Sequence, residues 1–446
     1  MRDSLLRPER IWKFGVILGV VSILSGIGHG EAPSQTPPAQ PGTADSSTPA
    51  KASATSENVP QAAGVIGLEL IDSCIENGSP LWYEAGPGGT VLVYLQYDLE
   101  RAAPNRAAGH FHFRVQARPG TELTLELKNL DNVWNGKSGS VAREMEQFVT
   151  SEDGQTWESH PTLRPDGERV LLPLKITGTQ LDVARIEPYR LSDLDRLLQE
   201  ISSKPGVQVQ TIGNTVEGRP LELIQIGRRD APFRVFLRAR AHPWESGGNW
   251  VVQGLIRRLL RNDDHAHKCL ERYQVTILPM ANKDGVARGR TRFNAQGMDL
   301  NRNWNEPADP KLAPENAALE TWLLGEIEQH RPPHLAIELH NDGRGLLHFS
   351  RPTVPDNDRY LSRMKSLEQL LRIHSWFSEG STKPSFNNPG TLGDGWLNRF
   401  QIDALVHELN ANRIARIDQP TSGALWQQYG ENLTTVLYEY FGSVKP

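Results

Sequence analysis

Apolar positions in this chain follow two different periods along its length. Before about residue 175 they recur at every second position, most clearly over residues 111–115 and 122–127, where Phe, Val and Leu alternate with polar side chains. Residues 91–95 and 170–174 form further short apolar runs, and Gly and Pro separate the runs. Short alternating segments with turns between them are typical of paired strands that bury one face. We therefore predict a small antiparallel β-sandwich over residues 63–178.

Past Pro188 long apolar runs alternate with amphipathic segments. The apolar runs predict buried strands at residues 233–241, 273–279, 335–339 and 402–406. The amphipathic segments predict helices at residues 250–260, 317–327, 361–376 and 424–441. An earlier helix is expected to begin with Ser192 as its N-cap. This alternation favours an α/β domain with a largely parallel sheet over residues 179–446.

The first 62 residues differ in composition from the rest of the chain. A basic segment precedes an apolar run at residues 14–28, and roughly 15 apolar residues after basic ones predict a secretory signal over residues 1–30. The run is shorter than the roughly 20 residues of a membrane-spanning helix. Residues 31–62 are rich in Pro, Ala, Ser and Thr and predict a disordered linker. We expect export to the periplasm or extracellular space, with no stable membrane span if the signal is cleaved and an N-terminal anchor otherwise.

The composition of the chain bears on its binding partners and on the chemistry of its cysteines. The 446-residue chain has a formal net charge of −5 and 38% hydrophobic residues, which gives no reason to expect nucleic acid as a partner. Cys74 and Cys269 are the only cysteines, too few for a disulfide framework or for a zinc site built mainly from thiolates. Composition does not decide whether these two cysteines pair or how many copies of the chain assemble.

Four chemically active residues follow the ends of predicted buried strands. His242 and Glu245 come after the first of these strands, His340 after the third and Glu408 after the fourth. Ligand sites in open α/β sheets lie beyond the carboxyl ends of the strands. Two imidazoles and one carboxylate, with a fourth position left for water, predict a catalytic site that holds one Zn²⁺ per chain.

Neighbouring residues compete with these assignments. Period two in a strand places Glu338 on the same face as His340, so that it remains a rival for the base, whereas His407 faces away from Glu408. His110 and His112 share one face of a predicted sandwich strand, where we expect a solvated or interdomain surface rather than a metal site.

Three ordered motifs resemble those of the M14 metallocarboxypeptidases. They are ARAHPWES at residues 239–246, MANKDGV at 280–286 and GMDLNRNW at 297–304. The chain is most similar to the cytosolic-type, deglutamylase-like branch, whose members carry a β-sandwich before the catalytic domain. The resemblance covers roughly residues 105–441. It implies a carboxypeptidase-type α/β/α sandwich with a mixed eight-stranded sheet.

The resemblance also implies a role for each candidate residue. We expect zinc to be held by His242, Glu245 and His340, and Glu408 to be the general base. We expect Arg292 to stabilise the oxyanion, and Asn301 and Arg302 to bind the terminal carboxylate of the substrate. These roles describe an exopeptidase that acts on the C-terminus of peptides or proteins. Arg288 and Arg290 are instead expected to be solvated loop residues.

The loop before Glu408 departs from the family pattern. It has no Tyr at the position where relatives often carry one, and Phe386 stands nearby. Gly393 falls where deglutamylases place a basic residue that receives an acidic side chain, which weakens the case for glutamate-chain trimming. The alternatives are therefore a cell-wall peptidase for γ-D-glutamyl or D-amino acid bonds, a deglutamylase, and a non-catalytic binding protein on the same fold.

Overall fold

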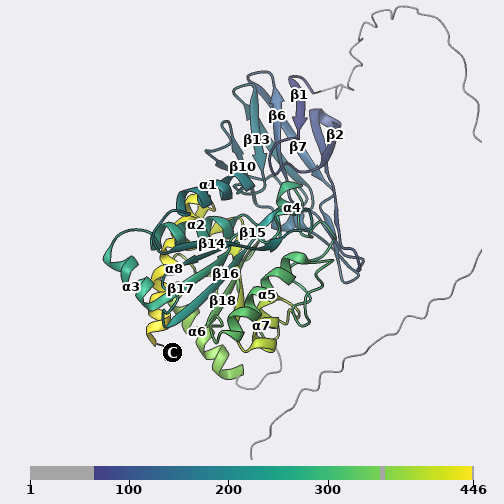
Figure 1. Ribbon diagram of the computed structural model, residues 1–446. Coiled ribbons are helices and arrows are strands. Elements are labelled where there is room, and N and C mark those ends of the chain that lie inside the picture. Colours follow the sequence, from purple (N-terminus) through teal and green to yellow (C-terminus); the bar gives the residue numbers. More distant parts are fainter. Residues whose placement is uncertain (1–64, 352–356, 444–446) are drawn as a thin grey trace, which may run out of the picture. The chain divides into compact units, whose positions relative to one another are not determined.

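A mixed seven-stranded sheet forms the centre of the α/β region (Figure 1). The structure is a computed structural model that describes residues 65–351 and 357–443. In spatial order the strands are β14 (Val207–Asn214), β15 (Pro220–Ile226), β17 (Tyr273–Leu278), β16 (Phe233–Ala239), β18 (Leu335–Asp342), β20 (Asp403–Asn410) and β19 (Leu347–Phe349). The four strands from β17 to β20 run parallel, whereas β14, β15 and β19 pair antiparallel with their neighbours. The predicted parallel core is thus confirmed.

The sheet has seven strands in the described residues instead of the eight implied by the resemblance. In place of an eighth strand, Ser381 forms a single parallel bridge to Leu347. The bridge is supported by the amide of Leu347, which donates to the carbonyl of Gly380, and by the amide of Thr382, which donates to the carbonyl of Leu347, both at 2.9 Å. Pro384 and Pro389 follow closely, and because proline has no amide hydrogen it does not extend a ladder.

Helices cover both faces of the sheet and make three layers (Figure 1). On one face lie α1 (Leu191–Ile201), α2 (Gly247–Leu259), α3 (Asp264–Arg272), α6 (Asn357–His374) and α8 (Gly423–Ser443). On the other lie α5 (Pro314–Glu328) and α7 (Leu392–Phe400). Val235 and Leu237 pack with the first group and Phe236 with the second, as the alternation of a strand requires. The short helix α4 (Lys283–Ala287) follows β17.

The predicted N-cap of α1 is wrong by two residues. Arg190 is the N-cap, and its amide donates to Oδ2 of Asp193 at 2.7 Å. Ser192 lies inside the first turn, where its amide and hydroxyl donate to the carboxylate of Glu76 at 2.8 and 2.7 Å. The serine therefore connects the helix to the N-terminal region instead of starting the helix.

Residues before α1 form three sheets. The first contains β1 (Leu68–Asp72), β6 (His112–Ala117), β13 (Gln180–Ala184), β10 (Gln147–Ser151) and β11 (Glu158–Pro161). The second contains β12 (Val170–Ile176), β7 (Thr121–Lys128), β3 (Thr90–Leu95) and β2 (Leu81–Ala85). The third is smaller and contains β4 (Asp98–Leu99), β5 (Arg106–Ala107), β8 (Asp131–Trp134) and β9 (Lys137–Ser140). The first two enclose one apolar core, which confirms a sandwich.

Two details of this region differ from the prediction. Strands β3 and β7 are parallel, whereas the other sandwich pairs are antiparallel. Strand β13 pairs with β6 and β10, so that the sandwich continues to Ala184, past the predicted boundary at residue 178. Short elements complete the list: the 3₁₀ turns Pro87–Gly89 and Val141–Glu144, and strands β21 (Arg413–Ile414) and β22 (Gln419–Pro420).

The predicted signal (1–30) and the whole of the predicted linker (31–62) lie outside the described residues, which begin at residue 65. Among the described helices, none has the length and apolar character needed to span a membrane. Cys74 is exposed, Cys269 is buried, and both are free thiols.

Candidate metal centre and active site

The turn between β16 and α2 carries two of the predicted metal ligands. Arg240 adopts a left-handed conformation with φ of 61°, which reverses the chain directly before His242. Its buried guanidinium donates from Nε to the carbonyl of Pro243 at 2.6 Å and from Nη1 to Oδ1 of Asn249 at 3.0 Å. This side chain therefore fixes the turn from inside, with His242 and Glu245 directed toward strand β18.

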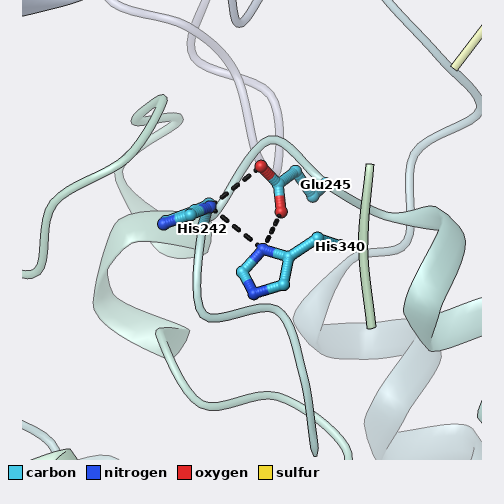
Figure 2. A group of neighbouring side chains, drawn as sticks. All are labelled: His242, Glu245 and His340. Carbon is cyan, nitrogen blue, oxygen red and sulfur yellow. Dashed lines mark hydrogen bonds and ion pairs between the residues drawn. The ribbon is translucent and has the colours of Figure 1, made fainter. Parts of the chain in front are cut away.

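His242, Glu245 and His340 converge on one point (Figure 2). Nδ1 of His242 lies 2.9 Å from Oε1 of Glu245, and Nδ1 of His340 lies 2.6 Å from Oε2 of the same carboxylate. The two Nδ1 atoms are 3.1 Å apart. All three side chains are buried. The structure thus brings together the three residues that the sequence assigns to the metal.

The donor set fits zinc. Tetrahedral ligands at zinc–nitrogen distances near 2.0–2.1 Å lie about 3.3 Å apart, which is close to the 3.1 Å between the two imidazole nitrogens. Their Nε2 atoms lie 3.1 Å from Oδ1 of Asp299 and 3.2 Å from Oε1 of Glu338. Because each Nε2 then donates to a carboxylate, each Nδ1 presents a lone pair to the centre, an arrangement that orients metal-binding histidines.

Charge at the centre also favours a cation. Burial alone would lower the pKa of His340, but Glu245 and Glu338 raise the pKa well above its ordinary value. Burial would likewise raise the pKa of Glu245, yet the two imidazoles hold it well below its usual range. A negative, acceptor-rich site of this kind stabilises positive charge.

Asp299 is a further residue of the candidate site, which the sequence motifs did not single out. Its Oδ1 meets His242, and its Oδ2 accepts from Nε of Arg292 at 2.8 Å. Arg292 and His242 outweigh burial and lower the pKa of Asp299 well below its usual range. The available signal was its place in the GMDLNRNW motif, two residues before Asn301. One carboxylate therefore couples a metal ligand to the predicted oxyanion arginine.

Glu408 lies on β20, in register with His340 on β18. Its Oε2 has no hydrogen-bond partner within the described residues, and burial together with Asp342 raises the pKa of Glu408 well above its ordinary value. A bound divalent cation acts on this pKa in the opposite direction. Glu408 is thus a free carboxyl group beside the metal ligands, as a general base requires.

The two other residues that could act as the general base, Glu338 and His407, each interact with a different side chain. Glu338 forms a buried ion pair with Arg238, whose Nε donates to Oε1 at 2.9 Å. His407 points to the opposite face of β20, as predicted, where its Nε2 lies 2.5 Å from the hydroxyl of Tyr429. Glu338 therefore supports His340 and does not compete as the base.

A cavity of about 330 Å³ adjoins the centre and is lined by Glu245, Glu408, Arg292, Asn301 and Arg302, among others. Asn301 is fixed in place because its Oδ1 accepts from the amide of Leu392 at 2.9 Å, and its Nδ2 lies beside the imidazole of His340. Arg302 donates from Nη1 to the carbonyl of Asn301 at 2.7 Å. Among the described residues no carboxylate forms an ion pair with Arg302, so that its guanidinium is available to an anion in the cavity.

The remaining candidates lie away from this cavity. Arg288 forms an ion pair with Glu217, and Arg290 donates to Gln96 at 3.3 Å. Phe386 is 37% exposed, with its ring centroid 4.8 Å from that of His348. Gly393 is buried at the start of α7, where a Cβ would meet Oγ of Ser350 and the backbone of Leu405. Gly393 is not among the residues that line the cavity.

His110 and His112 contradict the expectation of a solvated face. Both are buried. The amide of His110 donates to Oγ1 of Thr291 at 3.2 Å, so that the interdomain part of the expectation holds. Burial lowers the pKa of each imidazole to about 3.

Comparison with known proteins agrees with this geometry. Residues 194–370 match the peptidase M14 zinc carboxypeptidase family model. An uncharacterised protein of Zymomonas mobilis is 31% identical over 44% of this chain and 50% of that protein. Cytosolic carboxypeptidase 6 of Caenorhabditis elegans is 36% identical over 27% of this chain and 28% of that protein. The matched part thus spans half or less of these relatives.

A solved structure extends the comparison to the fold. The metallo-carboxypeptidase from Burkholderia cenocepacia has a TM-score of 0.73 at 20% identity, covering 84% of this chain and 99% of that one. The two proteins share a fold through the N-terminal sheets and the α/β region. The match of residues 194–370 to the M14 zinc carboxypeptidase model agrees with the resemblance that the motifs indicated.

Proposed function

We propose that the protein is a zinc-dependent metallocarboxypeptidase that hydrolyses the last peptide bond of peptides or proteins. One observation carries the proposal: metal-type ligands, the carboxyl group of Glu408 and a guanidinium that has no carboxylate partner in the described part of the chain border the same cavity. His242, Glu245 and His340 would hold the zinc ion, which would supply polarisation of a carbonyl and acidification of a water molecule. The family match and the carboxypeptidase fold support the same activity.

The protein's own side chains supply the remaining steps. Glu408 takes a proton from the attacking water and delivers it to the leaving amine. Arg292 donates to the oxyanion that develops at the scissile carbonyl, where Asp299 keeps the guanidinium oriented at 2.8 Å. A preorganised donor of this kind stabilises charge that is present only in the transition state.

Arg302 gives the proposal its exopeptidase character. A guanidinium binds a carboxylate through two parallel hydrogen bonds, and burial of Arg302, which lowers its pKa, makes an anionic partner favourable. The side chain of Asn301 is held beside it by the amide of Leu392, which donates to Oδ1 of Asn301. The substrate therefore places its terminal carboxylate at Arg302 and its last peptide bond at the metal.

Matched peptides test this function. The zinc-loaded protein should release the last amino acid from an N-acetylated peptide with a free C-terminus and leave the corresponding C-terminal amide intact. Cleavage of the amide, or cleavage in the middle of the peptide, would contradict the assignment of Arg302. A library of peptides with varied last residues then separates a general carboxypeptidase from a deglutamylase or a cell-wall peptidase.

Export is also part of the proposal. It rests on the basic and apolar segments within residues 1–30. N-terminal sequencing of the protein from the periplasmic fraction should begin near residue 31. A protein that keeps its original N-terminus and remains in the cytoplasm would contradict export without affecting the proposed chemistry.

A further inference from the structure

Trp134 belongs to the N-terminal region but faces the active site. It ends strand β8, which forms a hairpin with β9 in the small third sheet. Its half-buried ring borders the cavity together with Glu408 and Arg302. The hairpin is held by its own ladder and by the amide of Asn135, which donates to Oδ1 of Asn105 at 2.8 Å. The position of the ring is therefore set by the third sheet and does not depend on the α/β region alone.

Both arginines of the active site approach this one ring. The guanidinium carbon of Arg292 lies 4.5 Å from the ring centroid of Trp134, and that of Arg302 lies 5.5 Å from it. A tryptophan face attracts cations within about 6 Å of its centroid, more strongly than Tyr or Phe does. The two guanidinium groups are thus neighbours through a shared aromatic surface.

The contact with Trp134 stabilises two neighbouring positive charges, those of Arg292 and Arg302. Arg292 has Asp299 as a carboxylate partner, whereas Arg302 has none among the described residues. Two cations beside each other repel, and an aromatic face offsets part of this cost without consuming hydrogen-bond donors. A guanidinium that stacks through its face keeps its N–H groups, which lie in the plane, for carboxylate oxygens.

The same small sheet also holds the loop that carries Arg292. The carboxylate of Asp98, on β4, accepts from the amides of Arg292 and Phe293 at 2.7 and 2.9 Å. The amide of Arg101 donates to the carbonyl of Gly297 at 2.9 Å. The third sheet thus fixes the backbone of the arginine loop through β4, and the Trp134 ring contacts the side chains.

We propose that Trp134 is a positioning residue, which holds Arg292 and Arg302 in the geometry that receives the oxyanion and the terminal carboxylate of the substrate. The inference rests on the proposed function and assigns a task to the N-terminal sheets: they complete the active site. Trp134 itself donates nothing to the substrate. Its effect passes through the two guanidinium groups.

The first test compares variants in catalysis. Trp134→Leu should lower kcat/KM for a peptide with a free C-terminus by about 10- to 100-fold, since a cation–π contact with each of the two arginines is lost. Trp134→Phe keeps an aromatic face and should stay within roughly threefold of the wild type. Trp82→Leu is the matched control, because Trp82 is 53% exposed and stacks on Tyr94 in the sandwich. Zinc content and thermal midpoint are measured for all variants.

The second test measures binding without turnover. In a Glu408→Gln background, calorimetry compares an N-acetylated peptide with its C-terminal amide. Trp134→Leu should reduce the preference for the free carboxylate by about tenfold and leave the affinity for the amide unchanged. When Arg302→Ala is already present, Trp134→Leu should change this preference no further, because the ring acts through that side chain.

The outcomes separate the inference from the proposed function. An unchanged carboxylate preference and unchanged kcat/KM in Trp134→Leu would overturn the role of Trp134 and leave the carboxypeptidase standing. Equal losses for the free peptide and its amide would also overturn it, since they indicate a general structural defect. A zinc-loaded wild type that neither cleaves nor prefers the free C-terminus would overturn both.

Discussion

His340 and Glu408 lie directly opposite each other on the adjacent parallel strands β18 and β20. A metal ligand and the candidate base therefore share one rung of the sheet, with both side chains on the face that borders the cavity. A shift of either strand by one residue would turn its functional side chain to the opposite face. The apolar residues that alternate with them, Leu339 and Leu409, pack into the core on the other face and fix this register.

Replacement of the base should separate metal binding from catalysis. Glu408→Gln keeps the size of the side chain and removes its ability to take a proton. We expect turnover to fall by about 10²–10⁴-fold. Zinc content should stay at the wild-type level because Glu408 is not a ligand. Elemental analysis and a peptide-hydrolysis assay measure the two effects. Full turnover in the variant would show that another group is the base.

Asp299→Asn should weaken the centre without removing a ligand. The carboxylate supports His242 at 3.1 Å and Arg292 at 2.8 Å, and loss of such support typically costs 10- to 100-fold in metal affinity or activity. Titration with a competing chelator measures the zinc affinity. Glu306→Gln, which neutralises an exposed carboxylate in the same loop, is the control. Equal zinc affinity in the two variants would contradict the role of Asp299.

Acid should destabilise the protein through its buried histidines. The pKa of His110 and of His112 is about 3 in the folded state, compared with 6.5 ordinarily. Between these values the unfolded chain binds protons that the native protein does not, so that the free energy of unfolding falls as the pH falls from about 6.5 to about 3. Each histidine contributes a slope of up to about 1.4 kcal/mol per pH unit.

Urea unfolding at several pH values between 7 and 4 measures this slope. His112→Gln removes one titrating group and should flatten the dependence by up to one proton. His267→Gln, at an exposed position of α3, controls for the substitution itself. Comparison with the wild type cancels the contribution of the other titrating groups. Identical slopes for His112→Gln and the wild type would mean that His112 does not remain neutral in the folded state.

Two helix glycines should respond oppositely to alanine. A Cβ on Gly254 in α2 would lie 2.0 Å from the carbonyl oxygen of Gln427 in α8, whereas a Cβ on Gly325 in α5 would meet nothing within 4 Å. Gly254→Ala should therefore lower the free energy of unfolding by roughly 1–3 kcal/mol through overpacking. Gly325→Ala should raise it by roughly 0.5–1 kcal/mol because alanine favours the helix. Thermal midpoints that move in the same direction would contradict this packing of α2 against α8.

The sequence identified those features that depend on local periodicity or on motif order. Alternation marked the sandwich strands, continuous apolar runs marked the buried strands, and the strand ends together with the motifs located the candidate metal ligands. The direction of β3 relative to β7 was missed because periodicity carries no information on which strands pair. The N-cap at Arg190 was missed because the cap uses a backbone amide and Asp193 instead of the expected serine side chain.

Residues that act across the two halves of the chain were also missed. Trp134 contacts Arg292 and Arg302, more than 150 positions away. Asp98 likewise holds the backbone of Arg292 from a distant strand. No spacing rule connects such positions, because their proximity arises from how the third sheet meets the arginine loop.

Zinc content is the most direct measure of the central claim, that His242, Glu245 and His340 form a catalytic zinc centre. Elemental analysis of the purified full chain should find about one Zn²⁺ per chain, and His340→Ala should lose the metal together with all hydrolysis of a peptide with a free C-terminus. A wild-type protein that binds no zinc, or a His340→Ala variant that keeps zinc and activity, would contradict the account.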